Sequence, residues 1–284
     1  MSRRVFKNSD LDLSLRSEGY LILDLLTTED TNHLSRFFAE FSYCHRNDFS
    51  TTVLTQEFAV RKKVHQTLSA VLSRRLLSVL DNYKIILASY AVKLPQAPDS
   101  RVGLHQDFTF IDERSGIGLS IWCPLVEVNQ NNGWLGVLRG SQAFNSNLRE
   151  ASSLPYPDLI DTIEEKYLTY LPMRPGQVLF MDNRVFHSSS PNRSAQPRLV
   201  AAGLAVPAES QLLCCHYDAV GHEGHLEVYE VPDDFYLRHM VGSRPHEGRR
   251  VADAPRIVSP LTEEMIVARQ AELGTKLYSI NQEA

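Results

Sequence analysis

The pattern of hydrophobic and polar positions changes along the chain from helical spacing to short strands and back. Apolar residues within 28–41 recur at i, i+3, i+4 and i+7, which predicts an amphipathic helix with Thr28 as its cap. The same spacing predicts a second helix over about 60–80 and a closing helix over about 262–274. From about residue 84, short apolar runs broken by Gly, Pro and Asn replace this spacing. The expected order is therefore helices, then strands, then a helix.

The apolar runs after residue 84 are too numerous and too evenly spaced for alternating βαβ units. They read KIILASYAV, GIGLSIWCPL, GWLGVLRGS, GQVLFMD, RLVAAGLAVP and LEVYEVP, and an earlier run, EGYLILDLL, resembles them. Many short strands at this spacing are typical of a β-sandwich or barrel. A polar excursion over 145–172 separates two of the strands, and loops of that length are often functional. The sequence predicts a mostly β fold with flanking helices.

Composition and charge exclude some classes of protein. At 284 residues we expect a single domain, with a helical N-terminal part over about 1–82, a β core over about 84–232 and a C-terminal extension with a helix over about 233–284. A net charge of −5 gives no general attraction to nucleic acid or an anionic membrane. No apolar run has membrane-spanning length, and the first residues show no signal-peptide core. Four cysteines without a framework spacing fit a reducing compartment, so we expect a cytoplasmic protein of undetermined oligomeric state.

A histidine and an aspartate two residues apart stand in the run GLHQDFTF. In a strand His105 and Asp107 would point to one face and Gln106 to the other. His187 ends another apolar run far downstream. Two histidines and one carboxylate are the ligand set of non-haem iron(II) oxygenases, which leave positions open for a 2-oxo acid and O2. Each histidine alone would more often be a hydrogen-bonded histidine without a metal; the ordered set favours the metal.

A cation for the co-substrate follows in the same region. Arg198 stands eleven residues beyond His187, at the head of the next apolar run. A planar guanidinium suits a carboxylate better than lysine does, because it donates two parallel hydrogen bonds. An ordinary surface arginine at a strand start is the alternative.

With these residues in place, the chain resembles the phytanoyl-CoA dioxygenase family of Fe(II)/2-oxoglutarate-dependent oxygenases. The resemblance covers most of residues 18–207, and the stretches LHQD, NNGWLGVLRGS and HSSSPNRS carry most of it. It implies a double-stranded β-helix (jelly roll, cupin-like) core. It also implies Fe(II) as metal, with 2-oxoglutarate and O2 as co-substrates.

The resemblance also assigns roles to individual residues. The implied iron ligands are His105, Asp107 and His187, and Arg198 is implied to bind 2-oxoglutarate. By the same matching, Gln106, Trp122 and Ser189 are expected in the co-substrate pocket, although Trp122 fits a plain core role nearly as well.

The implied activity is hydroxylation of an unactivated C–H bond, with release of succinate and CO2. Asp107 fills the position that a small residue takes in related halogenases, which favours oxygen transfer. We expect a small-molecule substrate that is amino-acid-like, acyl or a secondary metabolite, because no basic cluster indicates a CoA 3′-phosphate. An acyl-CoA 2-hydroxylase stays open, as do desaturation, epoxidation and cyclisation, and so does a jelly-roll protein that binds metal without turnover.

Two further segments carry polar groups that no motif explains. Asp112 and Glu113 follow the strand of His105, where such folds place a loop at the mouth of the site, so substrate contact is one hypothesis and a solvated turn the other. The segment 214–225 holds Cys214, Cys215, His216, His222 and His225. Its spacing matches no zinc motif, so a mixed loop and strand is favoured over a structural zinc site.

Overall fold

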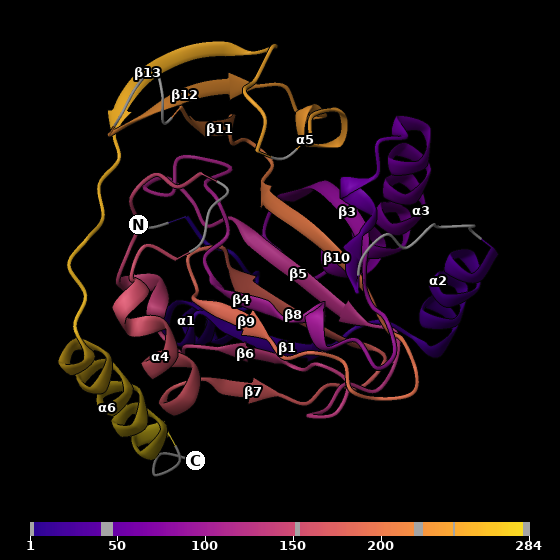
Figure 1. Ribbon diagram of the computed structural model, residues 1–284, viewed down its shortest axis with the longest axis horizontal. Helices are drawn as coiled ribbons and strands as arrows, with labels where there is room; N and C mark the ends of the chain where they lie inside the picture. The colour runs from indigo at the N-terminus through magenta and orange to yellow at the C-terminus, as the bar shows by residue number, and fades with distance from the viewer. Residues whose placement is uncertain (1–2, 41–47, 151–153, 219–223, 241, 281–284) are drawn as a thin grey trace.

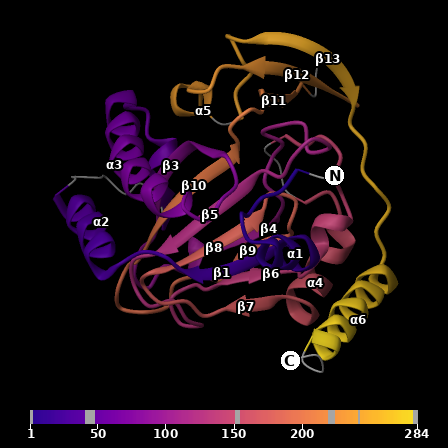
Figure 2. The same ribbon diagram turned by 180° about the vertical axis from the view of Figure 1, so that it is seen from behind.

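The computed structural model of the protein describes residues 3–40, 48–150, 154–218, 224–240 and 242–280. Two antiparallel sheets lie against each other at its centre, and a third sheet covers one end (Figures 1 and 2). This is the jelly-roll core with flanking helices that the resemblance implied, so the predicted fold class is confirmed.

The sheets have six, four and three strands. In spatial order the six-stranded sheet is β1 (Tyr20–Asp24), β8 (Gln177–Asp182), β5 (Leu119–Pro124), β10 (Arg198–Pro207), β3 (Tyr83–Lys93) and β2 (Phe49–Thr51). The four-stranded sheet is β4 (Val102–His105), β9 (His187–Ser189), β6 (Leu135–Val137) and β7 (Thr169–Leu171). The three-stranded sheet is β11 (Leu212–Tyr217), β12 (His225–Val231) and β13 (Arg249–Pro255). Strand β1 lies in the run EGYLILDLL that was expected to be a strand, whereas β2 was not expected in the N-terminal part of the chain.

The first three helices cover the outer face of the six-stranded sheet. They are α1 (Ser9–Glu18), α2 (Thr28–Glu40) and α3 (Phe58–Leu76). The predicted apolar stripe of α3 is buried, with Val64 and Leu68 in one core together with the sheet. The predicted cap of α2 is wrong by one residue: the Asp30 amide donates to the Thr27 hydroxyl, and the Thr27 amide donates back to the Asp30 carboxylate.

The remaining helices are α4 (Ile160–Lys166), α5 (Phe235–Arg238) and α6 (Glu263–Ile280). The excursion over 145–172 therefore holds α4 and the whole of β7, although residues 151–153 lie outside the described part of the chain. The predicted end of α6 near Gly274 is wrong, because Gly274 lacks the positive φ with which a glycine ends a helix. An extended segment joins β13 to α6, which packs near α4 (Figure 1).

The register of the six-stranded sheet determines which side chains face the four-stranded sheet. Ala202 of β10 lies opposite Ser89 of β3 on one side and Trp122 of β5 on the other. Opposed residues in an antiparallel sheet point to the same face. At the head of β10, Arg198 lies opposite Lys93 of β3 in the same way. Ser89, Trp122, Ala202 and Arg198 line one cavity.

Candidate metal centre

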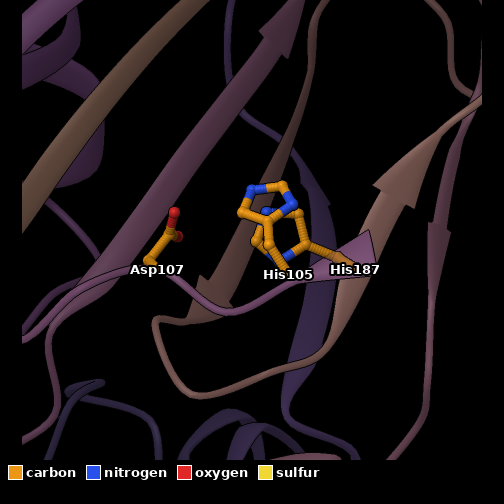
Figure 3. Close-up of side chains that lie close together, drawn as sticks. All are labelled: His105, Asp107 and His187. Atoms are coloured by element: carbon orange, nitrogen blue, oxygen red, sulfur yellow. The ribbon is translucent and has the colours of Figure 1, made fainter. Parts of the chain in front are cut away.

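Two neighbouring strands bring the predicted histidines together. His105 ends β4 and His187 begins β9, and their Cα atoms are register partners. Their ring centroids are 4.1 Å apart. Asp107 follows two residues after His105 and lies beside both rings (Figure 3). One ligand atom from each of the three residues can be chosen so that all lie within 4.8 Å of one another, close enough to hold one metal ion.

Backbone carbonyls fix the orientation of both imidazoles. His105 Nδ1 donates to the Gly103 carbonyl at 2.8 Å, and His187 Nδ1 donates to the Val185 carbonyl at 2.9 Å. Because a carbonyl oxygen only accepts, each Nδ1 carries the proton and each Nε2 keeps its lone pair for a metal. Burial and the neighbouring His105 lower the pKa of His187 to about 4. The ring is therefore neutral at neutral pH, as a metal ligand must be.

Asp107 is held by contacts on three sides. The Ser120 hydroxyl donates to the Asp107 carboxylate, and the Asp107 backbone amide donates to the Asn183 carbonyl at 3.1 Å. Arg149 Nε donates to the Asp107 carbonyl at 2.9 Å, while the guanidinium also binds Glu113. These bonds fix the backbone and the carboxylate before any metal arrives.

Two buried basic residues mark the other end of the cavity: Arg198 lines it, and Lys93 is the register partner of Arg198 on the neighbouring strand. Arg198 is 2% exposed; its Nη1 donates to the Gly133 carbonyl at 2.5 Å, and its guanidinium lies 5.2 Å from the centre of the Trp122 ring. Lys93 is 0% exposed, and its ammonium donates to the carbonyls of Ser189 and Ser190. Burial and the neighbouring Arg198 lower the pKa of Lys93 to about 6.

Neither Arg198 nor Lys93 has a carboxylate partner among the described residues. Arg198 Nε is also buried with no hydrogen-bond partner in that part of the chain. Buried charges are ordinarily paired, because leaving one unpaired in the interior is costly. An anion bound here would neutralise the charge and engage the free Nε, so this end of the cavity suits a carboxylate.

The cavity between the two ends has a volume of about 250 Å³. Most of its other lining is apolar, including Leu87, Phe110 and Met181. Six of the predicted site residues line it: His105, Asp107, Trp122, His187, Ser189 and Arg198. The structure thus brings together the whole predicted metal set and most of the predicted co-substrate set.

Three predicted residues lie elsewhere. The Gln106 amide donates to the carbonyls of Asn145 and Arg184 and accepts from the Asn145 amide, so it joins two loops outside the cavity. Strand alternation predicted that Gln106 points to the face away from His105. The structure agrees with that prediction and not with the pocket position that the resemblance implied. Asp112 pairs with Arg114, and Glu113 with Arg149; neither lines the cavity. Burial raises the pKa of Glu113.

Two residues of the site had no place in the sequence reasoning. Ser120 stands two positions before Trp122 in GLSIWCP, so strand alternation could have placed both in the cavity. Lys93 carried no signal, because a lysine at a strand end is ordinarily exposed.

The cysteine- and histidine-rich segment forms no second metal site among the described residues. The group of His105, Asp107 and His187 is the one cluster found there with metal-binding spacing. Burial raises the pKa of Cys214 to about 11 and of Cys215 to about 12. Both thiols therefore have the character of buried, unreactive cysteines. His222 lies outside the described residues.

The ligand set of the first cluster fits ferrous iron. Two neutral imidazoles and one carboxylate on one side of an ion leave its other side open. The tautomers are already fixed for binding, and Arg198 lines the same cavity as the three ligands. No helix in the described part of the chain is long and apolar enough to span a bilayer.

Comparisons with known proteins agree with this chemistry. The model of the family "Phytanoyl-CoA dioxygenase (PhyH)" matches residues 24–200. A search of curated proteins finds no significant match. Among solved structures, EctD from S. alaskensis, with 2-oxoglutarate and 5-hydroxyectoine, is 17% identical, with 88% of this chain and 86% of that chain covered and a TM-score of 0.53.

Two enzymes from nogalamycin biosynthesis share the fold. The epimerase SnoN is 18% identical, with 90% of this chain and 93% of that chain covered and a TM-score of 0.51. The carbocyclase SnoK is 17% identical, with 70% and 84% covered and the same TM-score. Because the family match spans more than half of the sequence, the chain belongs to the phytanoyl-CoA dioxygenase family and is an oxygenase that uses iron, 2-oxoglutarate and O2.

Proposed function

We propose that this protein hydroxylates an unactivated C–H bond of a small-molecule metabolite, with His105, Asp107 and His187 as the iron ligands and Arg198 as the 2-oxoglutarate carboxylate site. One observation carries the proposal. Three ligand atoms that fit Fe(II) lie within 4.8 Å of one another at one end of an apolar cavity, and a buried, unpaired guanidinium stands at the other.

Each part of the cavity then has a separate task. Bound iron, with O2 and 2-oxoglutarate, supplies the oxidising power for C–H cleavage. Arg198 holds the far carboxylate of the co-substrate, and Lys93 behind it adds positive charge once the bound anion favours its protonated form. Ser120 holds the Asp107 carboxylate, and the carbonyls behind both histidines hold their rings. The apolar walls exclude water and keep the substrate carbon near the metal.

Hydroxylation is the outcome that the residues support best. Asp107 is present and fully held, so the carboxylate position is filled and no site opens for a halide. The volume of about 250 Å³ suits a small substrate or a short segment of a larger one beside the co-substrate. Which carbon is oxidised depends on how the substrate lies in this space.

Iron binding under anaerobic conditions provides the test. With Fe(II) and 2-oxoglutarate, the wild-type protein should show the visible charge-transfer absorption of a bound iron–oxo acid chelate. Oxygen, with ascorbate, should then give slow succinate formation without any other substrate. His105→Ala should lose the absorption and the succinate. His33→Ala, at an exposed position on α2, should keep both and serves as the matched control.

Two results would remove the proposal. One is a wild-type protein that binds no ferrous iron. The other is a His105→Ala variant with the same absorption and the same succinate yield as wild type, because the ligand would then lie elsewhere.

A further inference from the structure

A second cavity, of about 190 Å³, lies next to the metal cavity. Phe108 and Tyr236 line both, so these two rings form the boundary between them. Strand β11 and the loop that follows α5 supply most of the other walls. The cysteine- and histidine-rich segment, which the metal centre leaves unexplained, thus borders the substrate side of the active site.

The boundary between the cavities is built from fixed aromatic rings. Phe108 packs against Phe110 with ring centroids 4.8 Å apart, and Phe110 meets Tyr236 edge-on at 4.9 Å. The Tyr236 hydroxyl donates to the Leu213 carbonyl, which ties the ring to β11. A substrate that occupied both cavities would lie against these two rings, so an apolar stretch at this point would suit it.

His239 lines the second cavity and carries an unsatisfied polar atom. The residue is 5% exposed, and its ring stacks on Phe235 at 4.4 Å. Its Nε2 lies 2.9 Å from the Ser243 carbonyl and must donate to it, so Nδ1 of the neutral ring is an acceptor. That Nδ1 is buried and has no hydrogen-bond partner among the described residues. It is the ring nitrogen left to meet an occupant of the cavity.

The remaining polar wall also offers acceptors. Arg256 donates twice to Glu150, but both bonds go to Oε1, so Oε2 has no partner among the described residues. The Arg256 guanidinium itself lies over the Tyr217 ring, 4.7 Å from its centre. Cys214 and Cys215 add thiols that burial keeps protonated, and these behave as small apolar groups. A hydrogen-bond donor complements such a cavity better than an anion does.

We propose that the second cavity binds the distal part of the substrate, that this part carries a hydroxyl or amine donor, and that His239 Nδ1 accepts its hydrogen bond. The carbon to be oxidised lies on the other side of the aromatic boundary, in the apolar cavity beside the metal. The substrate is then amphiphilic, with an apolar end near the iron and a hydrogen-bond donor in the second cavity. This inference rests on the proposed function and specifies its substrate class.

Histidine nitrogen chemical shifts test the contact directly. The probes are hexylamine, 1-hexanol and hexyltrimethylammonium. The last is the trimethyl analogue of hexylamine, with the same alkyl chain and charge but no hydrogen-bond donor. They are titrated into ¹⁵N-histidine-labelled protein loaded with Zn(II) and 2-oxoglutarate. The His239 Nδ1 resonance, assigned by its loss in His239→Gln, should move upfield with hexylamine or 1-hexanol, because an unprotonated ring nitrogen is shielded when it accepts a hydrogen bond.

Hexyltrimethylammonium should leave the Nδ1 chemical shift unchanged. It should bind roughly tenfold more weakly than hexylamine, since it leaves the buried acceptor unsatisfied. His246→Gln is the matched control: its exposed ring lies 5.5 Å from that of His239 but does not line the cavity. That variant should respond as wild type. Equal shifts with all three probes, or no shift with either donor, would overturn the inference.

A second measurement tests the direction in which the chain lies. With Fe(II) in place of Zn(II), under nitrogen, the paramagnetic ion should relax the terminal methyl protons of hexylamine more than the protons next to its nitrogen. The opposite gradient would overturn the inference. Neither measurement needs turnover, so a protein that binds the probes in this way but forms no succinate would contradict the proposed function and leave the second cavity as a binding site.

Discussion

The two ends of the metal cavity are built on different principles. At the metal end, both Nδ1 atoms and the Asp107 carboxylate are hydrogen-bonded within the protein. At the co-substrate end, Arg198 and Lys93 are buried without an acid among the described residues, and Arg198 Nε has no partner there. The metal end has its side chains hydrogen-bonded before iron binds, whereas the co-substrate end keeps a charge and a donor that a bound anion would satisfy.

This difference indicates how binding energy is divided. Bonds made within the protein fix the ligand geometry, so little ordering remains when iron binds. The uncompensated Arg198 guanidinium costs stability in the free protein, and burial lowers the pKa of Lys93 to about 6, which leaves that amine largely neutral near pH 7.5. An anionic co-substrate recovers this cost on binding. The affinity for 2-oxoglutarate therefore comes from charge that the fold leaves unpaired. Four variants test this contrast.

The largest effect is expected at the metal end, in Asp107→Ala. Removing the one carboxylate of the ligand set leaves two neutral imidazoles, which hold Fe(II) poorly. Succinate formation at saturating 2-oxoglutarate should fall by at least about 10³-fold, to the level without iron. Asp112→Ala, an acid five residues on that pairs with Arg114 outside the cavity, should retain wild-type turnover. Equal turnover in the two variants would contradict the assignment of Asp107.

At the co-substrate end, Arg198→Met should raise the KM for 2-oxoglutarate by roughly 100-fold, because a charge-assisted bidentate pair is worth a few kcal/mol. Steady-state succinate formation against 2-oxoglutarate concentration measures this, and turnover at saturation should change far less. Arg198→Lys should recover only part of the loss, since an ammonium lacks the planar pair of donors. An unchanged KM in the methionine variant would mean that another cation holds the carboxylate.

The contrast also shows what the sequence can and cannot predict. His105, Asp107, His187 and Arg198 are visible in the sequence because each combines a distinctive residue type with the end of an apolar run. Ser120 has a strand-alternation signal, but a serine in a strand has too many ordinary roles to stand out. Sequence patterns predicted both β3 and β10, but the pairing that places Lys93 opposite Arg198 joins segments a hundred residues apart, which local periodicity cannot predict.

Errors in the sequence predictions have physical causes of the same kind. Gln106 was assigned to the pocket by resemblance, yet alternation along the strand and the loop carbonyls of Asn145 and Arg184 place it outside. For Glu113, substrate contact was one hypothesis and a solvated turn the other; the residue is buried in a pair with Arg149, whose other bond supports the Asp107 carbonyl. Such partners come from distant loops, so the local sequence does not reveal them.

A smaller effect is expected in Ser120→Ala, which removes the hydroxyl that donates to the Asp107 carboxylate. Loss of a hydrogen bond that orients a metal ligand typically lowers metal affinity by about 10- to 100-fold. An anaerobic Fe(II) titration followed by the charge-transfer absorption measures this. At saturating iron the KM for 2-oxoglutarate should stay near the wild-type value, which separates this variant from Arg198→Met. An unchanged iron affinity would mean that the Asp107 carboxylate needs no support from Ser120.

The smallest effect on turnover is expected in Lys93→Met, which removes the second cation. Its KM for 2-oxoglutarate should rise roughly tenfold, since the ammonium acts from behind Arg198. The titration of Lys93 also makes the free energy of unfolding depend on pH, in a direction that can be derived. The pKa of Lys93 is lowered from 10.5 to about 6 in the folded protein, so between these values the unfolded chain binds more protons. The free energy of unfolding of the wild type should therefore rise with pH across this window, by up to about 1.4 kcal/mol per unit.

Chemical denaturation of the free protein at pH 6.5, 7.5 and 8.5 measures that slope, and Lys93→Met should make it shallower by the contribution of this one group. Binding of the anion favours the charged ammonium, so 2-oxoglutarate should carry a proton onto Lys93 when it binds near pH 7.5. Calorimetry in buffers of different ionisation enthalpy should detect this uptake in the wild type and not in the variant. Parallel stability curves, or proton uptake that survives in Lys93→Met, would show that Lys93 is already compensated in the free protein and that Arg198 alone distinguishes the two ends of the cavity.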